Sequence, residues 1–161
     1  MDYQKIAKNL KKNYDEKVIR TLKEIGNKFK DKEEVKKILK KENPVLYKVF
    51  IKEINENEMM GLTILNSGDI SDEFYMTKGH RHKKPISEKY ILIKGNGKLI
   101  LQNKLFKVVK LKKNKVVNVP GKFAHRLVNV GKGKLEVLAF YNKNAGHDYK
   151  TIFKKRLLKN G

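Results

Sequence analysis

The sequence has 161 residues, enough for one domain with its own core, and we expect residues 1–161 to form a single domain. It contains no cysteine, which excludes disulfide bonds and thiolate chemistry, and no apolar run of about 18 residues that would span a membrane as a helix. Lysine and arginine number 39 against 17 acidic residues, so the net charge is +22.

The basic excess is almost entirely lysine and is spread along the chain, with arginine only at positions 20, 81, 126 and 156. Neither an arginine-rich stripe nor an aromatic-lined RNA-binding motif accompanies it, so we expect no specific nucleic-acid partner and no membrane partner. A field of this sign would still attract an anionic small substrate. The first residues lack the apolar core of a signal peptide, which together with the absence of cysteine predicts a cytoplasmic protein.

Residues 1–42 read as an N-terminal helical or extended segment, because apolar residues recur at helical spacing between many lysines. The clearest helix lies in DKEEVKKILKKEN, where Asp31 is a capping residue and Glu33 and Glu34 fall in the favourable first turn. The first 20 residues fit either a helix or a strand and loop laid across the rest of the domain. Pro44 marks the turn out of the helix.

From Val45 the apolar period changes to two, which predicts β-strands over residues 43–149. Eight or nine short strands are expected, over 45–54, 59–68, 73–82, 88–95, 98–103, 105–120 and 125–142, some of these ranges holding two. We predict one hairpin about Gly95-Asn96-Gly97 and another turning at residues 131–133. This pattern indicates a mainly all-β, double-sheet jelly-roll barrel. Residues 150–161 form a basic tail that we expect on the outside.

Three of the four histidines fall in one pattern with a glutamate. His80 and His82 are two residues apart, so on a strand they project to the same face. Pro85 breaks that strand, which leaves Glu88 near the start of the next one, and His125 follows 37 residues later. A His-x-His pair alone is weak evidence for a metal. Three imidazoles and a carboxylate, however, suit a first-row divalent ion such as Fe, Mn, Ni or Zn with positions left open.

Longer motifs around these residues carry a resemblance to known families. The spacings Glu88-x6-Gly95 and Pro120-x4-His125-x3-Asn129 together resemble the two-part signature of the cupin barrel. The segments TKGHRH, EKYILIKGNGKLILQ, VPGKFAHRLVNVG and AFYNKNAGHDYKTI closely resemble the cupin-type phosphoglucose isomerases known mainly from archaea. One difference is that five residues separate His82 from Glu88, where members of the family have six.

The resemblance implies a metal-dependent homodimer that interconverts glucose 6-phosphate and fructose 6-phosphate, with one divalent metal per subunit. The family usually uses iron(II), and nickel, manganese or zinc in some members. The ligands implied are His80, His82, Glu88 and His125. Contacts to the sugar phosphate are implied for Tyr47, Thr63, Thr77 and Gly79, while Tyr141, His147 and Tyr149 would lie around the sugar.

The chemistry leaves two routes open for moving hydrogen between neighbouring carbons. Glu88 is the best-placed base for proton transfer, with His147 or Tyr149 relaying hydroxyl protons, but metal ligation weakens a carboxylate base. A hydride shift is the competing route. An iron-dependent cupin oxygenase and a non-catalytic sugar-phosphate-binding cupin are the alternative functions, and mannose 6-phosphate is an alternative substrate. Strand alternation predicts that Lys78, Arg81 and Arg126 point outward, away from the ligands.

Overall fold

A computed structural model describes residues 1–161. Its helices are α1 (Tyr3–Leu10), α2 (Leu22–Ile25), the short 3-10 helix η1 (Gly26–Lys28) and α3 (Lys32–Leu39). Its strands are β1 (Glu16–Thr21), β2 (Val45–Glu53), β3 (Glu58–Leu65), β4 (Asp69–Ile70), β5 (Glu73–Phe74), β6 (Glu88–Lys94), β7 (Gly97–Gln102), β8 (Phe106–Lys110), β9 (Val116–Val119), β10 (Ala124–Asn129) and β11 (Leu135–Asn142). No helix is both long and apolar enough to cross a membrane.

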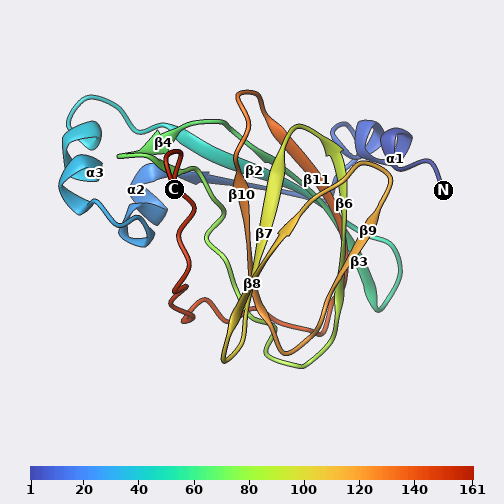
Figure 1. The fold of residues 1–161 in the computed structure, drawn as a ribbon. Helices are drawn as coiled ribbons and strands as arrows, with labels where there is room; N and C mark the ends of the chain where they lie inside the picture. Colours follow the sequence, from blue (N-terminus) through green and yellow to red (C-terminus); the bar gives the residue numbers. More distant parts are fainter.

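The strands form two facing antiparallel sheets (Figure 1). The larger sheet has the order β1-β2-β3-β11-β6-β9, the smaller has the order β10-β7-β8, and β4 pairs only with β5. The main apolar core includes Leu99 and Leu127 of the smaller sheet and Val137 of β11. The predicted double-sheet barrel is therefore confirmed.

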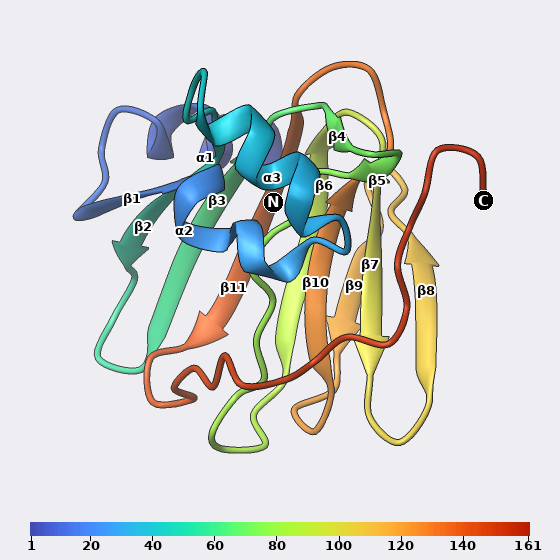
Figure 2. The same cartoon turned by 90° about the vertical axis from the view of Figure 1, so that its left-hand side faces the viewer.

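Both faces of the larger sheet are apolar, because helix α1 covers the face that does not meet the other sheet. Val137 belongs to the main core, whereas its neighbour Leu138 packs in a second cluster with Ala7 and Leu10 of α1. Figure 1 shows α1 and the α2–α3 pair on opposite sides of the barrel. Figure 2 shows α2 and α3 in front of the strands, with the C-terminal segment passing towards β8.

The N-terminal segment combines both conformations that its sequence allowed. Residues 3–10 are helical, and Glu16–Thr21 form a strand that pairs antiparallel with β2. The predicted later helix is α3, whose first free N–H groups are capped as expected, because the Asp31 carboxylate accepts a hydrogen bond from the Glu34 amide at 2.9 Å.

Both predicted hairpins are wrong in their pairing, although their strands exist. β6 belongs to the larger sheet and β7 to the smaller, and β10 and β11 are divided in the same way. The two turns cross from sheet to sheet and lie against each other, with the Val130 amide donating to the Asn96 carbonyl. A side chain on Gly95 would meet the Lys134 carbonyl, so glycine permits this close crossing. Alternating patterns identify strands but not their partners.

The predicted strand over 73–82 forms only in part. Regular pairing stops at Phe74, and the chain continues as an extended segment tied to β10 by single bridges, Met76 to Val128 and His80 to His125. Gly79 interrupts the regular strand because its φ is +77°, in the left-handed region. This irregular segment carries much of the candidate site.

Candidate functional site

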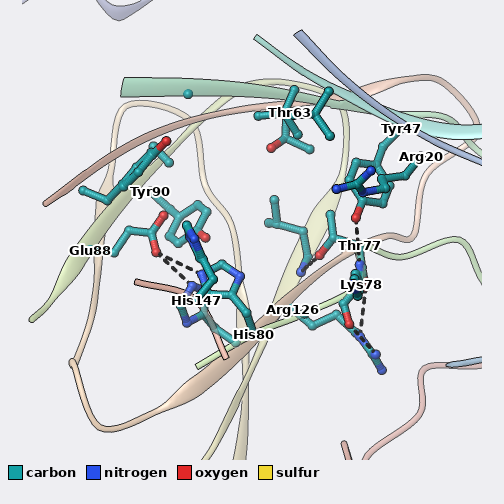
Figure 3. Close-up of a pocket in the computed structure, with 18 of the residues that line it drawn as sticks. Arg20, Tyr47, Thr63, Thr77, Lys78, His80, Glu88, Tyr90, Arg126 and His147 are labelled. Carbon is teal, nitrogen blue, oxygen red and sulfur yellow. Dashed lines mark hydrogen bonds and ion pairs between the residues drawn. The ribbon is translucent and has the colours of Figure 1, made fainter. Parts of the chain in front are cut away.

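A pocket of about 170 Å3 lies between the two sheets. Its walls come from β1, β2, β3, β6 and β11 of the larger sheet, from β10 of the smaller sheet, from the extended segment at residues 77–80 and from His147 and Tyr149. Figure 3 shows two ends: Glu88, His80 and His147 gather at one, while Tyr47 and Lys78 lie at the other. The two ends differ in chemistry.

The first end holds the four predicted ligand residues, whose donor atoms all lie within 4.8 Å of one another. His80 and His125 are brought together by a backbone bridge. The amide nitrogen of His80 lies 3.1 Å from the carbonyl oxygen of His125, and the reverse pair of atoms lies 2.8 Å apart. Glu88 begins β6, and its Oε2 lies 2.9 Å from Nε2 of both His82 and His125 and 3.8 Å from Nε2 of His80. With five residues between His82 and Glu88, the carboxylate therefore still lies beside the imidazoles.

The imidazoles are oriented by backbone carbonyls outside the cluster. A carbonyl oxygen only accepts, so we assign the proton of His82 to Nδ1, which donates to the Ile86 carbonyl at 2.7 Å. Nδ1 of His125 faces the Phe123 carbonyl at 3.3 Å in the same way. Such bonds leave Nε2 of each ring with a lone pair directed into the cluster, as in histidines that ligate metals.

The donor set fits a divalent metal. Nε2 of His80 and of His125 is buried with no hydrogen-bond partner, although the latter lies only 2.9 Å from Glu88. The bond angle is therefore wrong for a hydrogen bond, as expected when both atoms are directed at a common point rather than at each other. Unpartnered buried polar atoms are costly unless something else binds them. A cation held by these residues would satisfy them.

Electrostatics at His80 and Glu88 favours the protonation states that a metal requires. Burial lowers the pKa of His80 to about 4, so its ring is neutral. Burial would raise the pKa of Glu88, but the three neighbouring imidazoles hold it well below its usual value. Burial likewise lowers the pKa of His82, yet the bond to Glu88 raises it overall.

An aromatic wall borders the ligand cluster. His147 packs edge-on against His80, with ring centroids 4.4 Å apart, and stacks on Tyr149 at 5.9 Å. Burial lowers the pKa of His147, which leaves its imidazole neutral. Tyr141 of β11 lies 6.1 Å from the His147 ring and also lines the pocket. These three residues supply polar atoms close to the ligand cluster.

The second end of the pocket offers hydrogen-bond donors. The Tyr47 hydroxyl accepts from the Lys78 amide at 3.1 Å, and the Thr77 hydroxyl accepts from the Leu127 amide at 3.0 Å. Each hydroxyl therefore keeps its own proton to donate. The Gly79 amide has no acceptor in the protein. Thr63 of β3 lines the wall between the two ends (Figure 3).

Comparison with known sequences identifies the family. The model of the family described as "Glucose-6-phosphate isomerase (GPI)" matches residues 19–159. Glucose-6-phosphate isomerase of Pyrococcus abyssi is 38% identical over 142 residues, covering 84% of this chain and 75% of that protein. The enzyme of the same name from Thermococcus litoralis is 36% identical over 156 residues, covering 93% and 80%. The chain belongs to the glucose-6-phosphate isomerase family.

Comparison with solved structures supports the fold of this isomerase-family chain. Oxalate decarboxylase of Lactobacillus farciminis matches with a TM-score of 0.53 at 20% identity, over 64% of this chain and 30% of that one. Peruvianin-I from Thevetia peruviana matches with a TM-score of 0.52 at 14% identity, over 65% and 68%. The chain thus spans less than a third of the decarboxylase. At these identities the likeness concerns the fold alone, which is the cupin barrel.

Two residues of this isomerase-family site do not lie where we expected them. Lys78 lines the pocket, with its Nζ 4.1 Å from the Tyr149 ring centre. It lies two residues before His80, so the period of two already favoured the ligand side for Lys78, and the expectation misapplied that period. Arg126 also lines the pocket and is only 4% exposed, with its guanidinium donating to the carbonyls of Thr77 and Lys78. The expectation of outward charges was therefore wrong for both, while Arg81 is not among the lining residues.

Sequence reasoning missed two further polar lining residues. Arg20 falls in the first 20 residues, which fitted either a helix or a strand, and it lies on β1 directly opposite Tyr47 of β2 and lines the pocket. Tyr90 lies two residues after Glu88 on β6, so both project inward, and it is 6% exposed. The period of two at Glu88 and Tyr90 was a usable signal. For Arg20 no local signal distinguished a strand from a helix.

Proposed function

We propose that this chain is a metal-dependent aldose–ketose isomerase that interconverts glucose 6-phosphate and fructose 6-phosphate. The observation that carries the proposal is the pairing of two sites in one pocket: a cluster of three histidines and one glutamate at one end and a set of free hydrogen-bond donors at the other. A hexose phosphate has the matching pair of features, a carbonyl with its neighbouring hydroxyl and an anion. Membership of the isomerase family supports the same reaction.

His80, His82, Glu88 and His125 would hold the metal, which we propose to be iron(II), with nickel, manganese or zinc as functional substitutes. When bound, such an ion supplies a Lewis acid that stabilises negative charge on the substrate oxygens. The protein's contribution is to hold the ligands in a buried cluster with their lone pairs already oriented. This orientation comes from the carbonyls of Ile86 and Phe123.

We assign the proton transfer between C1 and C2 to Glu88. Its three imidazole neighbours all approach the same oxygen, Oε2, which leaves Oε1 for a second task. Oε1 takes a proton from one carbon and returns it to the other, with an enediol between the two steps. Glu88 lines the pocket, which supports a role for this carboxylate on the substrate. Incorporation of deuterium from the solvent separates this route from a hydride shift.

The residues of the aromatic wall would open the sugar ring and move protons between its hydroxyl groups. His147 is neutral because burial lowers its pKa, so it can accept a proton from one oxygen and return it to another. Tyr149 stacks on His147 and orients its ring. Tyr141 is kept in its neutral form, because burial raises its pKa to about 12, and it would donate to a sugar hydroxyl.

The opposite end would bind the phosphate. The hydroxyls of Tyr47 and Thr77 and the amide of Gly79 are donors without a protein acceptor, which is what phosphate oxygens require. Thr63, between the two ends, would contact the sugar chain. Because Arg20 enters the pocket from β1, we propose that segment 1–42, barrel 43–149 and tail 150–161 act as one domain.

The test is conversion by purified, metal-loaded protein of each sugar phosphate into the other, with mannose 6-phosphate as a third substrate. We expect turnover in both directions between glucose 6-phosphate and fructose 6-phosphate. Absence of turnover with both substrates would overturn the proposal, and dioxygen consumption in its place would favour an oxygenase. We also propose a homodimer, for which light scattering should give twice the mass of the single chain.

A further inference from the structure

Charge is distributed unevenly along the pocket. Three cationic side chains line it, Arg20, Lys78 and Arg126, and all lie at the end away from Glu88, which is the only lining carboxylate (Figure 3). Arg126 has a structural role, because its guanidinium donates to two backbone carbonyls and stacks on the Phe153 ring at 4.2 Å. Arg20 and Lys78 make no such set of contacts with the protein.

Arg20 has most of its hydrogen-bonding capacity free. Its position opposite Tyr47 in the β1–β2 register directs it to the inner face of the sheet. Its one hydrogen bond runs from Nη1 to Glu24 at 3.2 Å, and with both side chains roughly 40% exposed this ion pair is screened by water. A guanidinium has five N–H donors, so four remain without a protein acceptor in a side chain that lines the pocket.

Lys78 is likewise a cation without a carboxylate. It makes no ion pair and lies over the ring of Tyr149. A further lysine, Lys28, lies close by, donating to the Tyr149 carbonyl at 3.4 Å. Its pKa is lowered by burial and by the positive charges of Arg126 and Lys78, so Lys28 adds a third cation beside these two. A site with this balance attracts an anion.

We propose that Arg20 and Lys78 are specificity-determining residues that bind the phosphate group as a dianion and make the enzyme selective for phosphorylated over neutral sugars. The inference rests on the proposed isomerase function and adds charge recognition to the neutral donors of Tyr47, Thr77 and Gly79. The planar fork of Arg20 would take two phosphate oxygens, while Lys78 acts as a point charge. Segment 1–42 then contributes directly to substrate binding.

The kinetic test compares Arg20→Gln with Lys17→Gln in the metal-loaded protein. Lys17 lies on the same strand but on its other face, over the Phe50 ring, and does not line the pocket. Both changes remove one positive charge, so an effect that came only from the net charge of the protein would be equal in the two variants. We expect Arg20→Gln to raise KM for fructose 6-phosphate about tenfold or more with kcat changed less than about threefold, and Lys17→Gln to change neither. Glu24→Gln should not raise KM, because the exposed ion pair is not the source of the effect.

A binding test with inorganic phosphate does not depend on activity. By calorimetry, Arg20→Gln and Lys78→Met should each weaken phosphate binding about tenfold, Arg20→Lys should weaken it less, and Lys17→Gln should match the unmodified protein. Circular dichroism and the melting temperature check that each variant is folded. If Arg20→Gln is not folded, the test rests on Lys78→Met.

Two outcomes separate this inference from the proposed function. If the unmodified protein binds phosphate through Arg20 but converts neither sugar phosphate, the isomerase proposal fails and the anion site stands. If it converts fructose 6-phosphate while Arg20→Gln and Lys78→Met behave like Lys17→Gln in KM and phosphate affinity, the anion site is overturned. Phosphate bound only at the metal would give this second result.

Discussion

Replacing Gly79 with alanine adds one methyl group beside the ligand His80, and its cost can be worked out from the structure. The backbone at Gly79 has a φ of +77°, and a left-handed conformation costs a residue with a side chain about 1–2 kcal/mol. The added Cβ would lie 2.6 Å from Cε2 of Phe153 and 3.1 Å from Nε of Arg126. Relieving such overlap in a packed interior costs about 1–3 kcal/mol. We therefore expect Gly79→Ala to lower the free energy of unfolding by about 2–5 kcal/mol.

The assay is urea unfolding of the metal-free protein, followed by metal titration of the folded variant. Gly133→Ala is the matched control, since a Cβ there would meet nothing within 4 Å, and we expect a change within about 0.5 kcal/mol. Any strain that remains in the folded variant should displace His80 and weaken metal binding. Unfolding and metal affinity indistinguishable from those of Gly133→Ala would refute the claim that this turn must be glycine.

Three further predictions concern ligands, mechanism and pH. His82→Ala should reduce bound metal and activity at least about a hundredfold while the barrel stays folded, with Lys113→Ala as the unaffected control; elemental analysis showing full metal content would contradict the ligand assignment. Isomerisation of fructose 6-phosphate in D2O should place deuterium at C2 of the product, because Glu88 carries the abstracted proton while the enediol exists and exchanges it with solvent in that interval. Complete retention of hydrogen after many turnovers would favour a hydride shift. Burial raises the pKa of Tyr47 and raises that of Tyr141 to about 12, so the unfolded chain loses these protons first. Stability should therefore be full below pH 10 and fall as the pH rises from 10 towards 12, and an unfolding free energy that stays constant in this window would count against their burial.

The metal cluster was predictable because its information is local. His80 and His82 are separated by two residues on an extended segment, and Glu88 begins the strand after a break at Pro85. His125 is distant in sequence but close in space, because a backbone bridge joins it to His80. That bridge is a consequence of the barrel, which the alternating pattern of the strands already indicated.

Strand pairing and the cationic end of the pocket were less predictable, because both depend on contacts between distant parts of the chain. The turn at Gly95 looks like a hairpin turn, yet it crosses between sheets, since β6 pairs with β11 and β9. Arg20 reaches the pocket only through its register with Tyr47. Neither feature is encoded in the local pattern of polar and apolar residues. Lys78 differs, because it lies two residues before His80 and the period of two already favoured the ligand side for it.

The most direct test of the central claim is a metal titration of chelator-stripped protein, with fructose 6-phosphate turnover measured after each addition. Iron(II), nickel, manganese and zinc would be compared, with His82→Ala carried through the same additions. The account predicts no turnover in the stripped protein, a linear rise on adding metal, and a plateau at about one equivalent per chain, because a single cluster of three histidines and one glutamate is present. Turnover that survives stripping, or that responds to metal equally in His82→Ala, would contradict it.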